Sequence, residues 1–293
     1  MRILLLGLTS NIGFKFYKRF SLEFEIYATY RQLPKEIPNN NRFIKLESLS
    51  IKTLNKLVFD FKPEIIINTI AEGSIDKCEA DFDLCSQLNK ELVENLVNVI
   101  KNKDIKLIHF SSNAIYDGKT PPYTELSPPN PVNNYGKLKL KSDLIIRGNL
   151  KNYLLLRPIT LIGKSECFQR LNPATFIISK IEKNQKLKLV NDDIVNFLYL
   201  DDLVNILFKL IKTNATGEFN ISGDDILSRY ELGQVVLENI SKTVKISECS
   251  SLSFQSLAKR AENTSFDNSK IKKTLNFKFT PIDVAIRNII SNI

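Results

Sequence analysis

The chain has 293 residues, of which 43% are hydrophobic and 25% are charged, and this composition excludes a chain that is disordered along most of its length. Its 41 lysine and arginine residues outnumber its 32 aspartate and glutamate residues, which gives a formal net charge of +9 at pH 7. Because the basic residues are scattered and no base-stacking motif accompanies them, we expect a phosphorylated small molecule as partner, and neither nucleic acid nor a membrane surface.

Short apolar stretches alternate with amphipathic stretches in the first half of the chain. The expected strands cover residues 3–6, 25–29, 43–46, 65–68, 106–110 and 153–156, and the expected helices cover 12–20, 51–61, 84–101 and 135–147. Strands that are apolar without alternation are typical of a parallel sheet covered on both faces. The pattern therefore predicts an α/β fold, a Rossmann-type doubly wound parallel sheet built from right-handed βαβ units.

The alternation becomes irregular after residue 160, where the loops lengthen. We expect helices at 173–182, 201–212 and 229–240, and strands at 196–200 and 218–222. Residues 1–160, with 195–225 returning to them, are predicted to form the cofactor-binding domain. Residues 161–194 and 226–293 are predicted to form a smaller mixed part that binds the substrate.

The sequence shows no sign of export, of a membrane span or of a metal site. The apolar run at the start is interrupted by Thr9, Ser10 and Asn11, and no stretch reaches the ~18–20 apolar residues of a membrane helix. The 4 cysteines lack C-x-x-C spacing and there is 1 histidine, so we expect no zinc and reduced thiols in a cytoplasmic protein. Cys78 and His109 are expected to be structural residues.

The first expected strand runs directly into a turn that contains Gly7 and Gly13. Glycines in this place let backbone amides approach a pyrophosphate at the N-terminus of the next helix, although a tight turn without a ligand would use them too. Arg31 follows the second strand, where a site for NAD would carry an acidic residue. Its guanidinium could pair with a 2′-phosphate or lie in solvent, and the first interpretation favours NADP(H) over NAD(H).

A second constellation follows the fifth expected strand, which ends at Ser111 and Ser112. Tyr135 and Lys139 begin a later helix, and residues four apart lie on the same face of a helix. A phenol with a pKa near ~10 needs a neighbouring cation to exchange protons at neutral pH. Ser112 would hold a substrate oxygen at the sheet edge, so the three residues predict catalysis of hydride transfer.

These motifs, in this order, make the chain resemble the extended short-chain dehydrogenase/reductase superfamily, and within it the dTDP-4-dehydrorhamnose reductase-like branch of nucleotide-sugar enzymes. Further matching segments lie at residues 68–71, 117–118, 122–125, 131–137, 156–163, 197–203, 217–223 and 263–270. The resemblance implies that Tyr135 is the general acid/base, Lys139 its electrostatic partner and ribose ligand, and Ser112 the hydroxyl that orients the carbonyl.

The resemblance also implies a set of cofactor contacts. These are Gly7, Thr9, Ser10, Asn11, Ile12, Gly13, Arg31, Asn68, Ala71, Tyr135, Lys139 and Arg157, although Arg157 could instead form a structural ion pair. Three positions depart from the family pattern. Ser10 replaces a glycine and brings a Cβ towards the pyrophosphate. Ser112 replaces a threonine, and Asn113 an aspartate, so that the Asp-Glu pair of dehydratases is missing.

The resulting expectation is an NADP(H)-dependent reduction of a 4-keto nucleotide sugar for polysaccharide biosynthesis, in which Tyr135 protonates the developing alkoxide. Two alternatives stay open. One is a nucleotide-sugar 4-epimerase with tightly bound NAD, and the other is a non-catalytic NADP-binding regulatory subunit. An exposed helix pair would also allow a homodimer.

Overall fold

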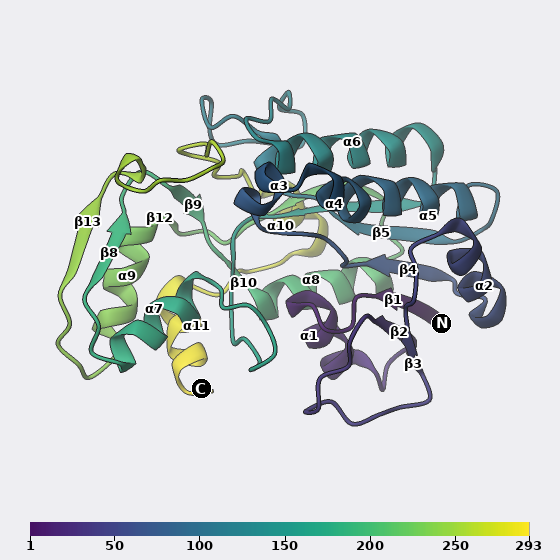
Figure 1. The fold of residues 1–293 in the computed structure, drawn as a ribbon, viewed down its shortest axis with the longest axis horizontal. Coiled ribbons are helices and arrows are strands. Elements are labelled where there is room, and N and C mark those ends of the chain that lie inside the picture. Colours follow the sequence, from purple (N-terminus) through teal and green to yellow (C-terminus); the bar gives the residue numbers. More distant parts are fainter. Residues whose placement is uncertain (293) are drawn as a thin grey trace.

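The computed structural model describes residues 1–292, and its centre is a seven-stranded sheet with the order β11-β6-β5-β4-β1-β2-β3 (Figure 1). Every neighbouring pair in this sheet is parallel. The strands are β1 (Arg2–Leu6), β2 (Glu25–Tyr30), β3 (Phe43–Lys45), β4 (Ile65–Asn68), β5 (Lys106–Phe110), β6 (Tyr153–Pro158) and β11 (Gly217–Ile221). The predicted Rossmann-type doubly wound sheet is confirmed, because the strand order reverses beside β1.

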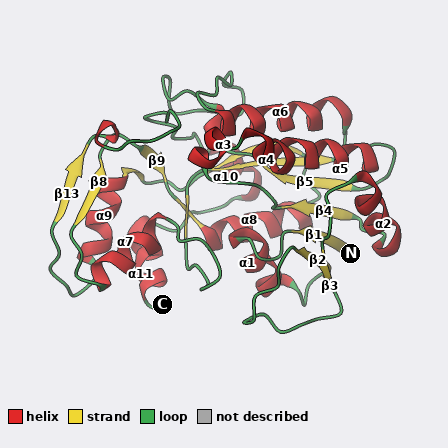
Figure 2. Ribbon diagram, viewed as in Figure 1, coloured by secondary structure: helices red, strands yellow, loops and turns green. Residues whose placement is uncertain are grey.

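Helices cover both faces of the sheet (Figures 1 and 2). One face carries α2 (Ile51–Phe61), α5 (Leu92–Ile100) and α6 (Asn134–Asn149), and the other carries α1 (Asn11–Phe20) and α8 (Leu200–Lys212). Successive side chains of β1 enter different cores: Ile3 and Leu5 pack towards α1, and Leu4 and Leu6 pack towards α2 and α5. This explains why the strand is apolar throughout.

The segment expected as one helix over residues 84–101 is divided into several pieces. It begins inside α4 (Phe82–Ser86), continues through a π-helical turn (Gln87–Glu91) and ends in α5, and a further short helix, α3 (Ile75–Ala80), precedes it. The buried side chain of Asn89 accepts a hydrogen bond from the Glu72 amide and donates one to the Glu72 carbonyl. The π-helical turn thus ties the helix to the loop after β4, which periodicity alone does not indicate.

The rest of the chain contains the predicted smaller part together with residues 195–199, which were expected to return to the cofactor-binding domain, and it forms helices and three two-stranded sheets, β10-β7, β12-β9 and β13-β8. Its elements are β7 (Leu161–Ile162), α7 (Pro173–Glu182), β8 (Leu187–Val190), β9 (Ile194–Asn196), β10 (Leu198–Tyr199), β12 (Ile226–Ser228), α9 (Arg229–Glu238), β13 (Ile246–Cys249), α10 (Ser269–Leu275) and α11 (Ile282–Ile290). One hydrophobic core joins this part to the large sheet, and α10 packs against β11. Within residues 1–292, no helix combines the length and apolarity needed to cross a membrane.

Candidate functional site

The turn after β1 has the backbone shape that a pyrophosphate cradle requires. Gly7 has φ +95°, and a Cβ on Gly13 would lie 2.8 Å from the Ser10 hydroxyl and still closer to the Gly7 carbonyl oxygen. Both positions therefore require glycine. The first turn of α1 leaves the amides of Asn11 and Ile12 without an intrahelical partner, and these amides point out of the helix N-terminus.

The Ser10 side chain is turned towards the protein. Its hydroxyl accepts a hydrogen bond from the Gly13 amide at 2.9 Å and donates one to Thr69 Oγ1 at 2.8 Å, so Ser10 is the N-cap of α1. The residue that departs from the family pattern thus stabilises the helix N-terminus. Asn11 Oδ1 is buried, and among residues 1–292 it has no hydrogen-bond partner. This oxygen is an acceptor, so the groups of the turn that suit a pyrophosphate are the backbone amides of Asn11 and Ile12.

A loop between β7 and α7 lies over this turn. Gln169 Nε2 donates to the carbonyl oxygens of Thr9 and Ser10, at 3.3 Å and 3.1 Å. Phe168 packs edge-on against Phe14, with ring centroids 5.3 Å apart. The loop is a part of the site that the sequence analysis missed, because one glutamine in a long loop carries no local signal.

Two of the expected cofactor residues lie in different surroundings. Arg31 directly follows β2 and is exposed, and its interaction with a 2′-phosphate stays a prediction. Asn68 is 1% exposed; its Nδ2 lies 3.3 Å from His109 Nδ1 and its Oδ1 accepts from the Ile70 amide at 3.1 Å. The Asn68 side chain thus shapes the loop that ends at the exposed Ala71, and the contact of this segment with a cofactor stays a prediction.

His109 lies inside the sheet, as a structural residue would. Burial, reinforced by the nearby charge of Lys139, holds its pKa well below the ordinary value, so the imidazole is neutral at pH 7.

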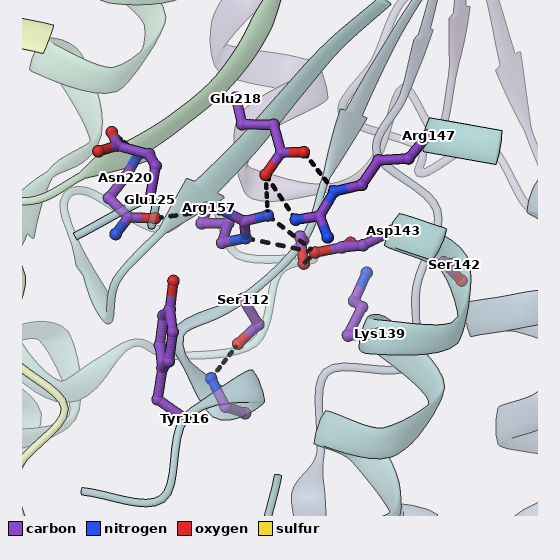
Figure 3. Close-up of polar contacts among 12 residues, drawn as sticks. Ser112, Tyr116, Glu125, Lys139, Ser142, Asp143, Arg147, Arg157, Glu218 and Asn220 are labelled. Carbon is purple, nitrogen blue, oxygen red and sulfur yellow. Dashed lines mark hydrogen bonds and ion pairs between the residues drawn. The ribbon is translucent and has the colours of Figure 1, made fainter. Parts of the chain in front are cut away.

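Ser112, Tyr135 and Lys139 meet at the carboxyl end of β5. Asn133 caps α6 by accepting from the Gly136 amide at 2.9 Å, which starts the helix just before Tyr135. The Lys139 Nζ lies 6.0 Å from the centroid of the Tyr135 ring and donates to the Phe110 carbonyl oxygen at 2.8 Å. Ser112 Oγ accepts from the Ala114 amide at 3.1 Å (Figure 3). The three side chains can therefore act on one substrate oxygen.

Burial dominates the protonation of this set. Burial raises the pKa of the Tyr135 phenol above its ordinary value, and the Ser112 hydroxyl only partly opposes this. Burial also lowers the pKa of Lys139 to about 8, against the opposing charge of Asp143. Loss of water dominates both pKa values, and the ammonium of Lys139 is not among the groups that shift the pKa of Tyr135 here, so the expectation that Lys139 makes the phenol acidic stays a prediction. Tyr135 is a protonated phenol at pH 7, the form that a general acid needs.

Arg157 has a structural role. It is 0% exposed, and its Nε and Nη2 both lie 3.3 Å from Asp143 Oδ2. It also pairs with Glu218, which binds Arg147 in turn (Figure 3). Of the two interpretations left open, the ion pair is the one that the structure shows, and the expected cofactor contact of the guanidinium is corrected because its donors are engaged inside the protein.

Two cysteines form a disulfide beside α6. Cys78 on α3 and Cys85 on α4 are bonded, and the pair packs with Leu138 against Tyr135. The expectation of reduced thiols is wrong for these two residues, because the chain reverses at Asp81 and brings together cysteines seven positions apart. Cys167 and Cys249 are free thiols. Cysteine usage therefore no longer argues for a reducing compartment.

Three features define this protein as a member of the extended short-chain dehydrogenase/reductase class. They are the parallel sheet, the glycine turn after β1, and the set formed by Ser112, Tyr135 and Lys139. Comparison with known families is more specific: the chain belongs to the RmlD substrate binding domain family, whose model matches residues 1–293. The resemblance inferred from the motifs is thus confirmed.

Individual relatives fall into two groups. Methionine adenosyltransferase 2 subunit beta of Xenopus tropicalis is 29% identical over 237 residues, which cover 79% of this chain and 70% of that protein. dTDP-4-dehydrorhamnose reductase of Aggregatibacter actinomycetemcomitans is 24% identical over 283 residues, covering 88% and 94%. The dTDP-4-dehydrorhamnose reductase of Bacillus anthracis str. Ames, solved with NADP, has a TM-score of 0.89 at 21% identity, with 100% of this chain and 99% of that chain covered. At this identity the structural likeness establishes the fold.

Proposed function

We propose that the protein is an NADP(H)-dependent oxidoreductase that reduces the 4-keto group of a nucleotide sugar. The observation that carries the proposal is the meeting of Ser112, Tyr135 and Lys139 at the sheet edge where this fold binds its ligands. A protonated phenol beside a serine hydroxyl suits a carbonyl that must receive a proton as it becomes an alcohol.

The residues present fit a dinucleotide. The amides of Asn11 and Ile12 and the shape imposed by Gly7 and Gly13 would hold the pyrophosphate, and Arg31 would face a 2′-phosphate. The bound cofactor would supply the hydride. The structure of the Bacillus anthracis relative contains NADP, which supports the same preference here, with NAD as the weaker alternative.

The roles of the three residues follow from their positions. Ser112 donates a hydrogen bond to the substrate carbonyl and so aligns it with Tyr135. Tyr135 gives its proton to the oxygen as negative charge develops there. The Lys139 ammonium then stabilises the phenolate left behind, which would otherwise be costly in this buried place.

We place the nucleotide-sugar substrate in a hollow of about 350 Å³ in the smaller part. Arg229, Phe254 and Arg260 line it together with the carboxylates of Asp192, Asp193 and Glu262, and the two arginines form ion pairs with Asp193 and Asp76, which a diphosphate would have to replace. The adjoining loop is joined to the catalytic helix, because the Lys259 carbonyl accepts from Asn133 Nδ2 at 3.0 Å. Arginine and an aromatic ring are the side chains that suit a diphosphate and a base.

The test is a panel of 4-keto nucleotide sugars assayed for NADPH oxidation with the wild type and Tyr135→Phe. We expect turnover in the wild type, a loss of at least about 100-fold in the variant, and NADPH binding within a few-fold of the wild type. Full activity of the phenylalanine variant would remove Tyr135 from the mechanism. NAD that stays bound through purification, with epimerisation and no net NADPH oxidation, would favour the 4-epimerase.

A second candidate is a non-catalytic NADP-binding regulatory subunit, favoured by the match to methionine adenosyltransferase 2 subunit beta. The two candidates differ in one observation. A regulatory subunit would show stabilisation by NADP(H) in a thermal-shift assay without turnover of any nucleotide sugar, and Tyr135→Phe would leave its behaviour unchanged.

A further inference from the structure

Four side chains at intervals of four residues occupy one face of α6: Tyr135, Lys139, Asp143 and Arg147. The first two belong to the catalytic set proposed above. Asp143 follows one helical turn further on, is 0% exposed and takes no part in the proton transfer. A fully buried carboxylate is costly unless it is paired, so its position needs an explanation.

Asp143 is held from two strands of the sheet. The Ser111 hydroxyl at the end of β5 donates to Oδ2 at 3.0 Å, and the Arg157 guanidinium on β6 contacts the same oxygen through two nitrogens (Figure 3). The other oxygen, Oδ1, is buried and has no hydrogen-bond partner among residues 1–292. The carboxylate is thus fixed in place while part of its acceptor capacity remains unused.

Unlike the carboxylate of Asp143, the buried ammonium of Lys139 is held by an uncharged group. Lys139 is 2% exposed, and the hydrogen-bond acceptor recorded for its ammonium is the uncharged carbonyl of Phe110. Burial favours the neutral amine, and Asp143 is the group whose charge opposes that effect. A neutral Lys139 could not stabilise the phenolate that Tyr135 becomes.

We propose that Asp143 is a positioning residue, whose carboxylate, clamped by Ser111 and Arg157, keeps Lys139 in its ammonium form beside Tyr135. This inference rests on the proposed function and adds to it the residue that sets the charge of the catalytic lysine. Burial raises the pKa of the Asp143 carboxyl above its ordinary value, and the charge of Arg157, followed by the Ser111 hydrogen bond, opposes this rise. Arg157 therefore acts on Lys139 through Asp143, by favouring the ionised carboxylate.

The other titratable groups around this cluster do not replace Asp143. On β5, His109 is neutral at pH 7 because burial holds its pKa far below the ordinary value. On β11, Glu218 is engaged by Arg147 and Arg157. The remaining groups coupled to Asp143, Tyr135 or Arg157 come from β6 and from the loops after β4 and β5; they are Tyr153, Glu72 and Tyr116, and Glu125 acts on Tyr116.

The test compares two substitutions, each of which neutralises one of the two carboxylates that form ion pairs with Arg157. Asp143→Asn keeps an acceptor for Ser111 and Arg157 but removes the charge that faces Lys139. Glu218→Gln is the matched control, because Glu218 binds the same arginine without being among the charges that act on Lys139. Protein labelled with ¹³C-lysine reports the protonation of Lys139 by NMR, and Lys139→Met identifies its signal.

We expect the Lys139 titration midpoint, near pH 8 in the wild type, to fall by about one pH unit or more in Asp143→Asn. It should stay in place in Glu218→Gln. The alkaline limit of kcat should move to lower pH in Asp143→Asn by the same amount, with KM for NADPH unchanged. An unchanged or raised midpoint in folded Asp143→Asn overturns the proposal.

If Asp143→Asn does not fold, the same titration of Lys139 is measured in Ser111→Ala. Loss of the Ser111 hydrogen bond makes the carboxylate easier to protonate, so the Lys139 midpoint should shift downwards by less than in Asp143→Asn. No shift in this variant overturns the proposal. A wild type that shows the NMR shifts but no turnover would refute the proposed function and leave the coupling of Asp143 to Lys139 intact.

Discussion

Replacement of Gly136 by alanine tests whether close packing of α6 against the turn after β5 aligns the catalytic residues. A Cβ at Gly136 would lie 2.9 Å from the Ala114 carbonyl carbon and 2.9 Å from Pro131 Cβ, and still closer to the Ala114 carbonyl oxygen. Carbon atoms in contact prefer about 3.5–4.0 Å, so the helix and the turn must separate by about 1 Å.

That separation acts on both stability and catalysis. Overpacking of this kind destabilises a protein by about 1–3 kcal/mol. Tyr135 lies on the helix and Ser112 precedes the turn, so their alignment changes as well, and a misplacement of about 1 Å can lower kcat about 100-fold. NADPH binding depends on the turn between Gly7 and Gly13 and should stay within a few-fold of the wild type.

Gly148 near the other end of α6 provides the control. No heavy atom lies within 4 Å of a Cβ built there, so Gly148→Ala should leave kcat unchanged and raise the free energy of unfolding by about 0.4–1 kcal/mol. Urea unfolding and steady-state kinetics with a 4-keto nucleotide sugar measure both quantities. A Gly136→Ala variant with the stability and kcat of the wild type would refute the idea that this contact aligns Tyr135 with Ser112.

Three further predictions concern the cofactor, the catalytic lysine and the disulfide. Arg31→Ala should lower kcat/KM for NADPH about 10-fold or more by removing a charge-assisted contact, while kcat/KM for NADH stays the same; an unchanged ratio would show that Arg31 does not bind the 2′-phosphate. The pKa of Lys139 falls from 10.5 in the unfolded chain to about 8 in the folded state. Between these two pH values the unfolded chain binds one more proton than the folded chain, so a rise in pH favours the folded state. The free energy of unfolding of the wild type relative to Lys139→Met should therefore rise by about 1.4 kcal/mol per pH unit in this range. Urea unfolding at several pH values measures this, and a constant difference would contradict the lowered pKa. Reduction of the Cys78–Cys85 disulfide should lower the free energy of unfolding by about 2 kcal/mol, whereas the reductant should have no effect on the variant in which serine replaces both cysteines.

Local patterns in the sequence were enough for the sheet and for the main motifs. Apolar runs such as residues 65–68 are recognisable as buried strands because both faces of the sheet are covered, and β4 is observed at Ile65–Asn68. The spacing of Tyr135 and Lys139 predicted a shared helix face, since the helical period is itself a local property. The segment 84–101 was harder, because the π-helical turn carries Asn89, whose side chain forms two hydrogen bonds with Glu72, and no local periodicity indicates a contact to that loop.

The sequence by itself determined the alternation of strands and helices along the first half of the chain, the glycine turn, and the shared helix face of Tyr135 and Lys139. What only the tertiary structure decided is how the environment changes those residues. The buried pairing of Arg157 with Asp143, the bond between Cys78 and Cys85, and the high pKa of Tyr135 all depend on neighbours distant along the chain or on the exclusion of water. Burial and charge are sums over everything that packs around a group, and no single stretch of sequence contains that sum.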